Sequence, residues 1–235
     1  MSTLILGALE AELIQFRSNL TNRCDEQWKT LSISEGNLDG AEVIVASCGV
    51  GKAMAAMATQ HFVDRYAPSR VIFTGIAGSL NRELEIGDVV VARDSIQYDL
   101  DARAAGFEIG RIPFTSYREI PCDPAMLSAA RSFPAKGFRL VEGRILTGDR
   151  FWARVEADAA DLLSEELAGD AVEMEGASVG LVALFNGLPF LLLRTISDKA
   201  DGSEKAEFKK FLPVASERAF RVVLHLLRII SHPAG

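Results

Sequence analysis

The sequence has few of the residues from which metal centres, disulfide frameworks and histidine-based catalytic sites are built. Its 235 residues include three cysteines and three histidines, and the residues of each type are scattered along the chain. Cysteines without a metal-ligand spacing predict neither a zinc site nor a disulfide framework, and they favour a reducing, cytoplasmic setting. Scattered histidines argue against a Ser-His-Asp triad. Acid–base chemistry is therefore expected to depend on carboxylates.

The chain also lacks the features of membrane proteins and nucleic-acid-binding proteins. No stretch reaches the roughly 18 apolar residues that a spanning helix needs. The first residues carry no basic segment, and Glu10 and Glu12 interrupt the apolar start, so no signal peptide is expected. Lys and Arg number 25 against 32 Asp and Glu, giving a formal net charge of −7. Because phosphate backbones bind basic faces, we expect neither a nucleic acid nor a membrane as partner.

No repeat, low-complexity segment or linker divides the chain, so residues 1–235 are expected to form one domain. Short apolar runs alternate with segments of helical spacing, which predicts a mainly parallel, layered sheet. Strands are expected at Leu4–Leu6, Lys29–Asn37, Glu42–Cys48, Val71–Phe73, Asp88–Ala92, Arg139–Leu146, Ala171–Met174 and Phe190–Ile196. Helices are expected at 10–20, 52–66, 125–131, 176–185 and 207–230.

Ligands of such sheets bind beyond the carboxyl ends of the strands, where several charged residues of this chain fall. Glu173 and Glu175 end an apolar strand and have no cation next to them in sequence. Burying a carboxylate alone is costly, so they are either helix-start acids or contacts to a ligand such as a ribose diol. Arg194 lies inside an apolar strand that ends at Asp198. It either forms a plain ion pair with Asp198 or orients one acid while another transfers protons.

A glycine-containing turn, Gly49–Lys52, connects a strand to a helix and invites comparison with nucleotide-binding loops. A P-loop would require glycine at Ala46 and a hydroxyl at Ala53, and the dinucleotide fingerprint would require a small residue at Met54. The segment therefore predicts a tight turn, whose helix N-terminus could still help to bind an anion. Further on, Phe151-Trp152 predicts either core aromatics or a ring that stacks on a flat base.

Seven motifs in this order resemble those of the 5′-methylthioadenosine/S-adenosylhomocysteine nucleosidases of the purine nucleoside phosphorylase-like superfamily. The resemblance implies a three-layer α/β/α sandwich with a central mixed, mainly parallel sheet, a homodimer, and no metal or organic cofactor. It also implies a small adenine nucleoside as the partner. The motifs are Gly7–Glu12, Ser47–Lys52, Thr74–Gly78, Gly87–Val91, Thr147–Phe151, Val172–Glu175 and Arg194–Asp198.

The resemblance assigns a role to each matching residue. Asp198 matches the general acid at N7 of adenine, and Glu12 the residue that activates water. Phe151 matches the aromatic that stacks on adenine, and Trp152 the position whose backbone reads the purine edge. The other expected contacts to the substrate are Leu9, Ile76, Gly78, Glu173, Met174, Glu175, Arg194, Ser197 and Phe208. The expected 5′ pocket takes Ala105, Phe107 and Pro113 from the neighbouring subunit.

Because of three departures from the family pattern, the sequence does not decide which nucleoside is the substrate. Leu9 replaces a common methionine, Ile76 stands where some members have serine, and Ala105 is smaller than the expected aromatic. Arg103 could bind a substrate carboxylate near the 5′ pocket. The alternatives are a hydrolase of futalosine or aminodeoxyfutalosine, a phosphorylase, and a nucleoside-binding sensor without catalysis. The presence of both Glu12 and Asp198 argues against a sensor, and acids in place of a phosphate-binding arginine argue against a phosphorylase.

Overall fold

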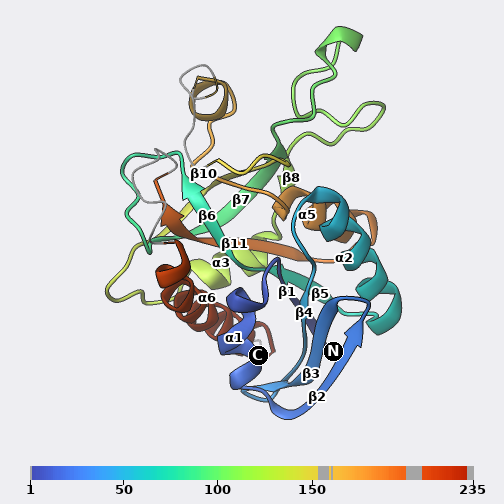
Figure 1. The fold of residues 1–235 in the computed structure, drawn as a ribbon, viewed down its shortest axis with the longest axis vertical. Helices are drawn as coiled ribbons and strands as arrows, with labels where there is room; N and C mark the ends of the chain where they lie inside the picture. The colour runs from blue at the N-terminus through green and yellow to red at the C-terminus, as the bar shows by residue number, and fades with distance from the viewer. Residues whose placement is uncertain (1, 153–158, 160, 200–207, 232–235) are drawn as a thin grey trace.

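A computed structural model describes residues 2–152, 159, 161–199 and 208–231. A mixed sheet runs through this part of the chain in the strand order β2-β3-β4-β1-β5-β11-β6-β10-β9-β7-β8 (Figure 1). The strands are β1 (Thr3–Gly7), β2 (Thr21–Trp28), β3 (Leu31–Leu38), β4 (Ala41–Ser47), β5 (Arg70–Phe73), β6 (Ile76–Ser79), β7 (Val89–Gln97), β8 (Ile120–Pro121), β9 (Leu140–Thr147), β10 (Ala171–Glu173) and β11 (Phe190–Asp198).

Helices cover both faces of the sheet, which confirms the predicted α/β/α sandwich. One layer holds α1 (Glu10–Ser18), α3 (Pro124–Arg131) and α6 (Phe208–Ser231), with α6 in contact with the other two. The other layer pairs α2 (Lys52–Tyr66) with α5 (Gly176–Phe185) (Figure 1). None of the described helices is long and apolar enough to cross a membrane.

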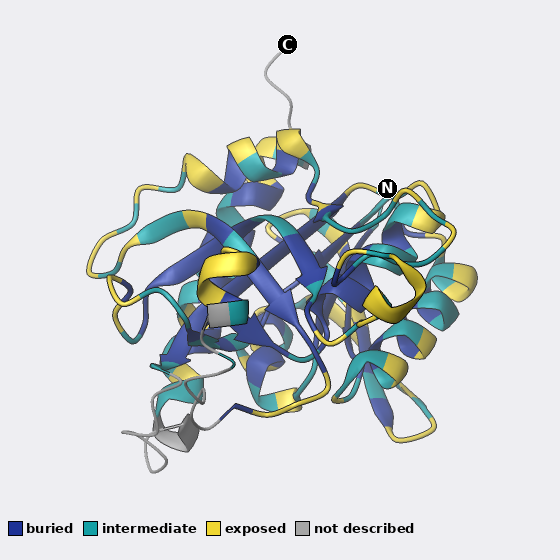
Figure 2. Cartoon of the chain, turned by 90° about the horizontal axis from the view of Figure 1, so that it is seen from above, coloured by how far each residue is buried: buried dark blue, intermediate teal, exposed yellow. Residues whose placement is uncertain are grey.

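The centre of the sheet is parallel and buried on both faces. β1 pairs in parallel with β4 and β5, and β5 pairs in parallel with β11. All five residues of β1 are buried, as the continuous apolar run of the sequence predicts for a strand covered on both sides. Buried residues concentrate in these strands, and exposed ones lie on the outer helix faces and loops (Figure 2). This arrangement brings the carboxyl ends of several strands to one edge.

The second half of the sheet closes on itself, which the sequence did not predict. The first residues of β11 pair with β5, and the later ones pair with β6 on one side and with β7 on the other. The pairs β6–β10, β10–β9 and β9–β7 complete a ring of five strands. All nine positions of β11 except Asp198 are buried, because this strand belongs both to the ring and, through β5, to the first half of the sheet.

The expected hairpin between 29 and 48 is confirmed, and three strands, β2, β6 and β8, were missed. Asp39 and Gly40 both have positive φ, as a two-residue hairpin turn requires. The longest of these, β2, lies at the edge and pairs only with β3 within the described chain. Its residues are mostly exposed and polar, so they show no apolar alternation from which a strand could be predicted.

Candidate active site

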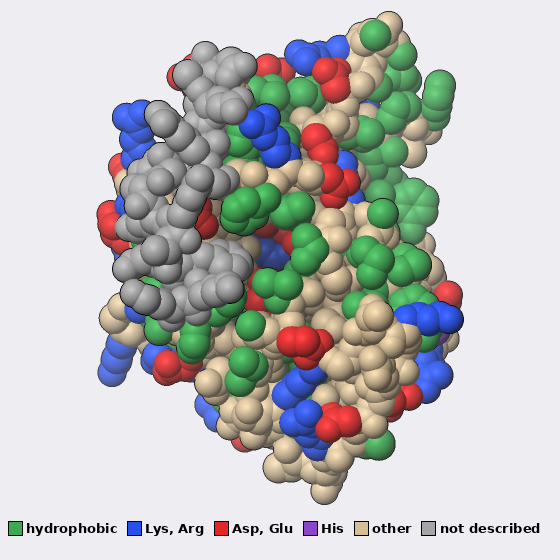
Figure 3. All heavy atoms as spheres, viewed as in Figure 1, with side chains coloured by type: hydrophobic (Ala, Val, Ile, Leu, Met, Phe, Trp, Pro, Cys, Tyr) green, Lys and Arg blue, Asp and Glu red, His purple; other side chains and the backbone are tan. Residues whose placement is uncertain are grey.

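A cavity of about 190 Å³ opens at the carboxyl ends of the strands. In the space-filling view it is a hollow rimmed by apolar side chains, with charged side chains visible inside it (Figure 3). Its lining contains eleven of the sixteen predicted site residues. It is formed by Ala8, Leu9, Glu12, Val50, Ile76, Ala77, Gly78, Arg150, Phe151, Trp152, Val172, Glu173, Met174, Glu175, Ser197 and Asp198.

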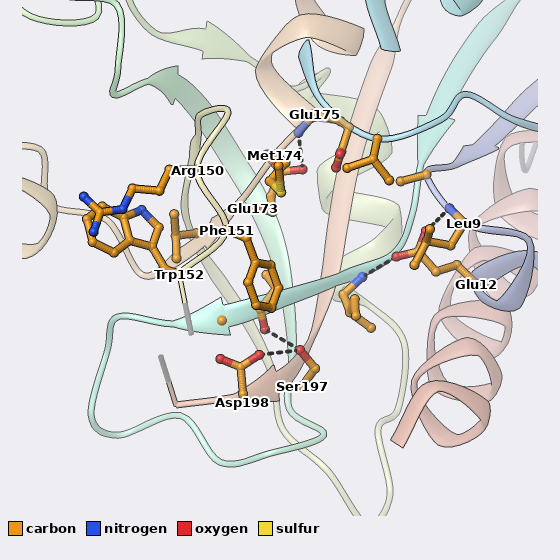
Figure 4. Close-up of a pocket in the computed structure, with 16 residues that line it drawn as sticks. Leu9, Glu12, Arg150, Phe151, Trp152, Glu173, Met174, Glu175, Ser197 and Asp198 are labelled. Carbon is orange, nitrogen blue, oxygen red and sulfur yellow. Dashed lines mark hydrogen bonds between the residues drawn. The ribbon is translucent and has the colours of Figure 1, made fainter. Parts of the chain in front are cut away.

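Glu12 lies in the first turn of α1 and points into the cavity (Figure 4). Its two carboxylate oxygens accept hydrogen bonds from the backbone N–H of Leu9 at 2.8 Å and of Ile76 at 3.1 Å. Its side chain is buried, and this burial raises its pKa above the ordinary value, although Arg194 and the two N–H groups oppose the shift. Glycine at position 75 leaves space for the Glu12 carboxylate, because a Cβ there would lie 2.5 Å from Glu12 Oε1.

Arg194 is paired, but with Glu173 rather than with Asp198. Its Nη2 lies 2.6 Å from Glu173 Oε2, and its guanidinium carbon lies 4.0 Å from the centre of the Phe73 ring. Both members of the ion pair are buried. Glu173 also accepts hydrogen bonds from the Thr147 hydroxyl and from the backbone N–H groups at the start of α5. Glu173 is therefore both a helix-start acid and the partner of a buried guanidinium.

Glu175, two residues further on, is available to a ligand. Its Oε1 accepts a hydrogen bond from the Gly51 N–H at 2.8 Å, and its side chain lines the cavity. Burial, reinforced by the negative charge of Glu173, raises the pKa of Glu175 to about 8. At neutral pH this carboxyl therefore holds a proton in the folded protein, and the unfolded chain does not hold it.

This difference predicts a measurable slope of stability against pH. Because the pKa is raised in the folded state, the free energy of unfolding falls as pH rises from 4.5 to about 8. The contribution of Glu175 to this slope reaches about 1.4 kcal/mol per pH unit. Urea unfolding between pH 5 and 9 should show a flatter slope for Glu175→Gln than for the wild type. Glu35→Gln, at an exposed position, is the control, and equal slopes in all three proteins would contradict the assignment.

Asp198 lies across the cavity from Glu12, at the end of β11 (Figure 4). The Ser197 hydroxyl donates a hydrogen bond to Asp198 Oδ2 at 2.8 Å. Asp198 is half-buried, whereas Glu12 is buried, so the two carboxylates meet a ligand from opposite walls with different solvation.

The two adjacent aromatics have different environments. Trp152 is buried, its indole N–H donates to the Tyr98 hydroxyl at 2.8 Å, and the Arg150 guanidinium carbon lies 3.8 Å from its ring centre. Phe151 is 65% exposed and lines the cavity. Trp152 thus packs into the core, and Phe151 presents a ring face on which a planar group could stack.

Some predicted residues lie elsewhere. Ala105, Phe107 and Pro113 are on the arm between β7 and β8, outside the cavity lining, with Ala105 in the short helix η1 (Arg103–Ala105). Arg103 makes a two-point contact with Asp101 and is engaged there. Arg194 lies behind the cavity wall, and the side chain of Phe208 lies outside the described part of the chain.

The sequence missed some residues that line or support the cavity. Val50 and Arg150 line it, and Tyr98 anchors Trp152. Val50 could have been found, because it lies in the turn already singled out between a strand and a helix. Nothing local in sequence indicates that Tyr98 meets a residue 54 positions later. Among the residues that the structure describes, no group of three or more His, Cys, Asp or Glu could hold a metal ion.

Comparison with known proteins finds full-length relatives. The family model described as the phosphorylase superfamily matches residues 3–228. The 5′-methylthioadenosine/S-adenosylhomocysteine nucleosidase of Geobacillus thermodenitrificans is 34% identical, with 100% of this chain and 99% of that protein covered. The Colwellia psychrerythraea nucleosidase, solved with adenine, superposes with a TM-score of 0.90 at 30% identity, covering 97% and 95%. The native futalosine hydrolase of Helicobacter pylori superposes with a TM-score of 0.88 at 28% identity, covering 97% of each chain.

Proposed function

The chain belongs to the phosphorylase superfamily and, within it, to the 5′-methylthioadenosine/S-adenosylhomocysteine nucleosidases, and we propose that it hydrolyses the N-glycosidic bond of these two nucleosides. The products are adenine and the 5-thio-substituted ribose. The observation that carries the proposal is the placement of Glu12 and Asp198 on opposite walls of one cavity, beside the exposed ring of Phe151.

Asp198 is the proposed general acid. Cleavage of the C1′–N9 bond leaves electrons on adenine, and a proton shared with N7 makes the base a better leaving group. A carboxyl group at the end of β11, oriented by the Ser197 hydroxyl, can supply that proton. The Phe151 ring gives the base a face to stack on, and the backbone of Trp152 is proposed to read its edge.

Glu12 is the proposed general base. The breaking bond builds oxocarbenium-like positive charge on the ribose, and a second carboxylate across the sugar activates water, as in inverting glycosidases. Both oxygens of Glu12 are fixed by backbone N–H groups, so its orientation does not depend on the substrate. Glu175, whose Oε1 is occupied by Gly51, keeps its other oxygen for a ribose hydroxyl, with Met174 beside it.

The charges of the cavity support hydrolysis over phosphorolysis. Of the lining residues in the described chain, Arg150 is the one base, and Glu12, Glu173, Glu175 and Asp198 are acids. Arg194 is already paired with Glu173. A phosphate dianion at the position of the attacking water would therefore meet the Glu12 carboxylate, with no cation of the described lining other than Arg150 to offset the repulsion.

We further propose that a second copy of the chain completes the 5′ pocket in a homodimer. The arm with Ala105, Phe107 and Pro113 lies away from its own cavity, and Phe114 on it is 94% exposed. The small side chain of Ala105 leaves room for a larger 5′ substituent.

The test is adenine release by purified protein from methylthioadenosine, S-adenosylhomocysteine and aminodeoxyfutalosine, each with and without phosphate. We expect release from the first two without phosphate, and no acceleration on adding it. If adenine release depends strictly on phosphate, the protein is a phosphorylase and the proposed hydrolysis is wrong. A preference for aminodeoxyfutalosine would contradict the assignment of methylthioadenosine and S-adenosylhomocysteine as substrates. It would leave the assignment of the reaction, hydrolysis of an N-glycosidic bond, in place.

A further inference from the structure

The start of helix α2 holds two carboxylates from distant parts of the chain. The Gly51 N–H donates to Glu175 Oε1, and the Lys52 N–H donates to Asp149 Oδ1, both at 2.8 Å. The first N–H groups of a helix have no partner within it, so they bind acceptors from elsewhere. The turn that resembles a phosphate-binding loop is therefore occupied by the protein's own acids.

Asp149 is also held from a second side. Its backbone N–H donates to Asp99 Oδ2 at 2.8 Å, and the Lys52 ammonium lies 2.6 Å from Asp99 Oδ1. Lys52, Asp99 and Asp149 thus close a ring of contacts between the start of α2, the turn after β7 and the loop after β9. We call these three residues the acid–lysine ring.

The loop that leaves this ring carries one wall of the cavity. Arg150, Phe151 and Trp152 follow Asp149 directly and all line the cavity. Trp152 is anchored through its indole N–H to Tyr98, the neighbour of Asp99. The loop is therefore fixed at both ends, and the exposed Phe151 ring between them depends on these anchors for its position.

We propose that Asp149 is a positioning residue, which through the acid–lysine ring sets the position of the Phe151 ring in the cavity. The identity of the stacked group as adenine rests on the proposed function. Asp149 touches neither Glu12 nor Asp198 in the contacts described above, so its loss should weaken binding of the base and leave the proton transfers in place.

The first experiment measures the KM for methylthioadenosine, kcat, and the Kd for adenine in Asp149→Ala. Loss of a charge-assisted hydrogen bond predicts a rise of roughly tenfold in KM and Kd, with kcat changed far less. Asp149→Asn keeps an acceptor oxygen for the Lys52 N–H and should restore most of the binding. Asp64→Ala, an exposed acid on the same helix, is the matched control and should change neither constant.

The second measurement needs no substrate. In a Trp28→Phe background, Trp152 is the single tryptophan and reports the loop directly. Asp149→Ala, and to a smaller extent Lys52→Met, should shift its emission to longer wavelength and increase quenching by acrylamide. Unchanged emission together with unchanged KM and Kd would overturn the proposal. If the wild type neither binds adenine nor cleaves methylthioadenosine, the proposed function fails, and the emission still decides whether Asp149 positions the loop.

Discussion

Glu12→Gln will release adenine from methylthioadenosine about 10²–10⁴-fold more slowly than the wild type, which is the usual contribution of a positioned general base. The amide cannot accept a proton from water, although it fills the same space between Leu9 and Ile76. The measurement is kcat by adenine absorbance, with the far-ultraviolet circular dichroism spectrum recorded to show that the variant is folded.

The pH dependence makes this prediction specific to Glu12. A base acts when ionised, and burial raises the pKa of Glu12, so the wild-type rate should fall as pH drops through a pKa above 4.5. The residual rate of Glu12→Gln should not show this fall at low pH. Glu10→Gln, in the same turn of α1 but exposed and paired with Arg17, is the control and should keep the wild-type rate. A Glu12→Gln rate within tenfold of the wild type would contradict the assignment of Glu12 as the general base.

Arg194→Met will lower the free energy of unfolding by about 3–5 kcal/mol, the usual cost of removing one partner of a buried ion pair. Glu173 and Glu12 are 7% and 5% exposed, and the substitution leaves them without the guanidinium that compensates their charge. Methionine keeps an apolar side chain against Phe73, so the loss reports mainly on charge. Urea unfolding at pH 7 measures the effect.

A double variant separates this charge effect from a packing effect. Arg194→Met combined with Glu173→Gln removes both members of the pair and should recover part of the lost stability, since no lone carboxylate remains at that position. A loss for Arg194→Met below about 1 kcal/mol would show that the pair is worth no more than a surface ion pair.

The sequence predicted those features that depend on neighbouring residues. Apolar runs located the central strands, and the acids after them, such as Glu12 and Glu175, were correctly expected at the carboxyl edge of the sheet. The partner of Arg194 was not predictable, because Asp198 is closer in sequence than Glu173 and only the folded sheet decides between them.

Long-range contacts account for the rest of what the sequence missed. Gly51 and Glu175 are 124 positions apart, and Lys52 and Asp149 are 97 apart, so no local pattern joins them. The closure of the sheet depends on β11 pairing with three strands at once, which its apolar run permits but does not specify. The Gly49–Lys52 turn was correctly expected to be a turn, and only the structure shows that its helix N-terminus binds the chain's own acids.

The measurement that tests the central claim most directly compares two leaving groups in Asp198→Asn. Adenine needs a proton to leave, whereas the nitrophenolate of a p-nitrophenyl 5-methylthioriboside does not. We predict a loss of about 10²–10⁴-fold in kcat with methylthioadenosine and a far smaller loss with the nitrophenyl substrate. Equal losses on both substrates, or full activity on methylthioadenosine, would contradict the assignment of Asp198 as the acid that protonates the leaving base.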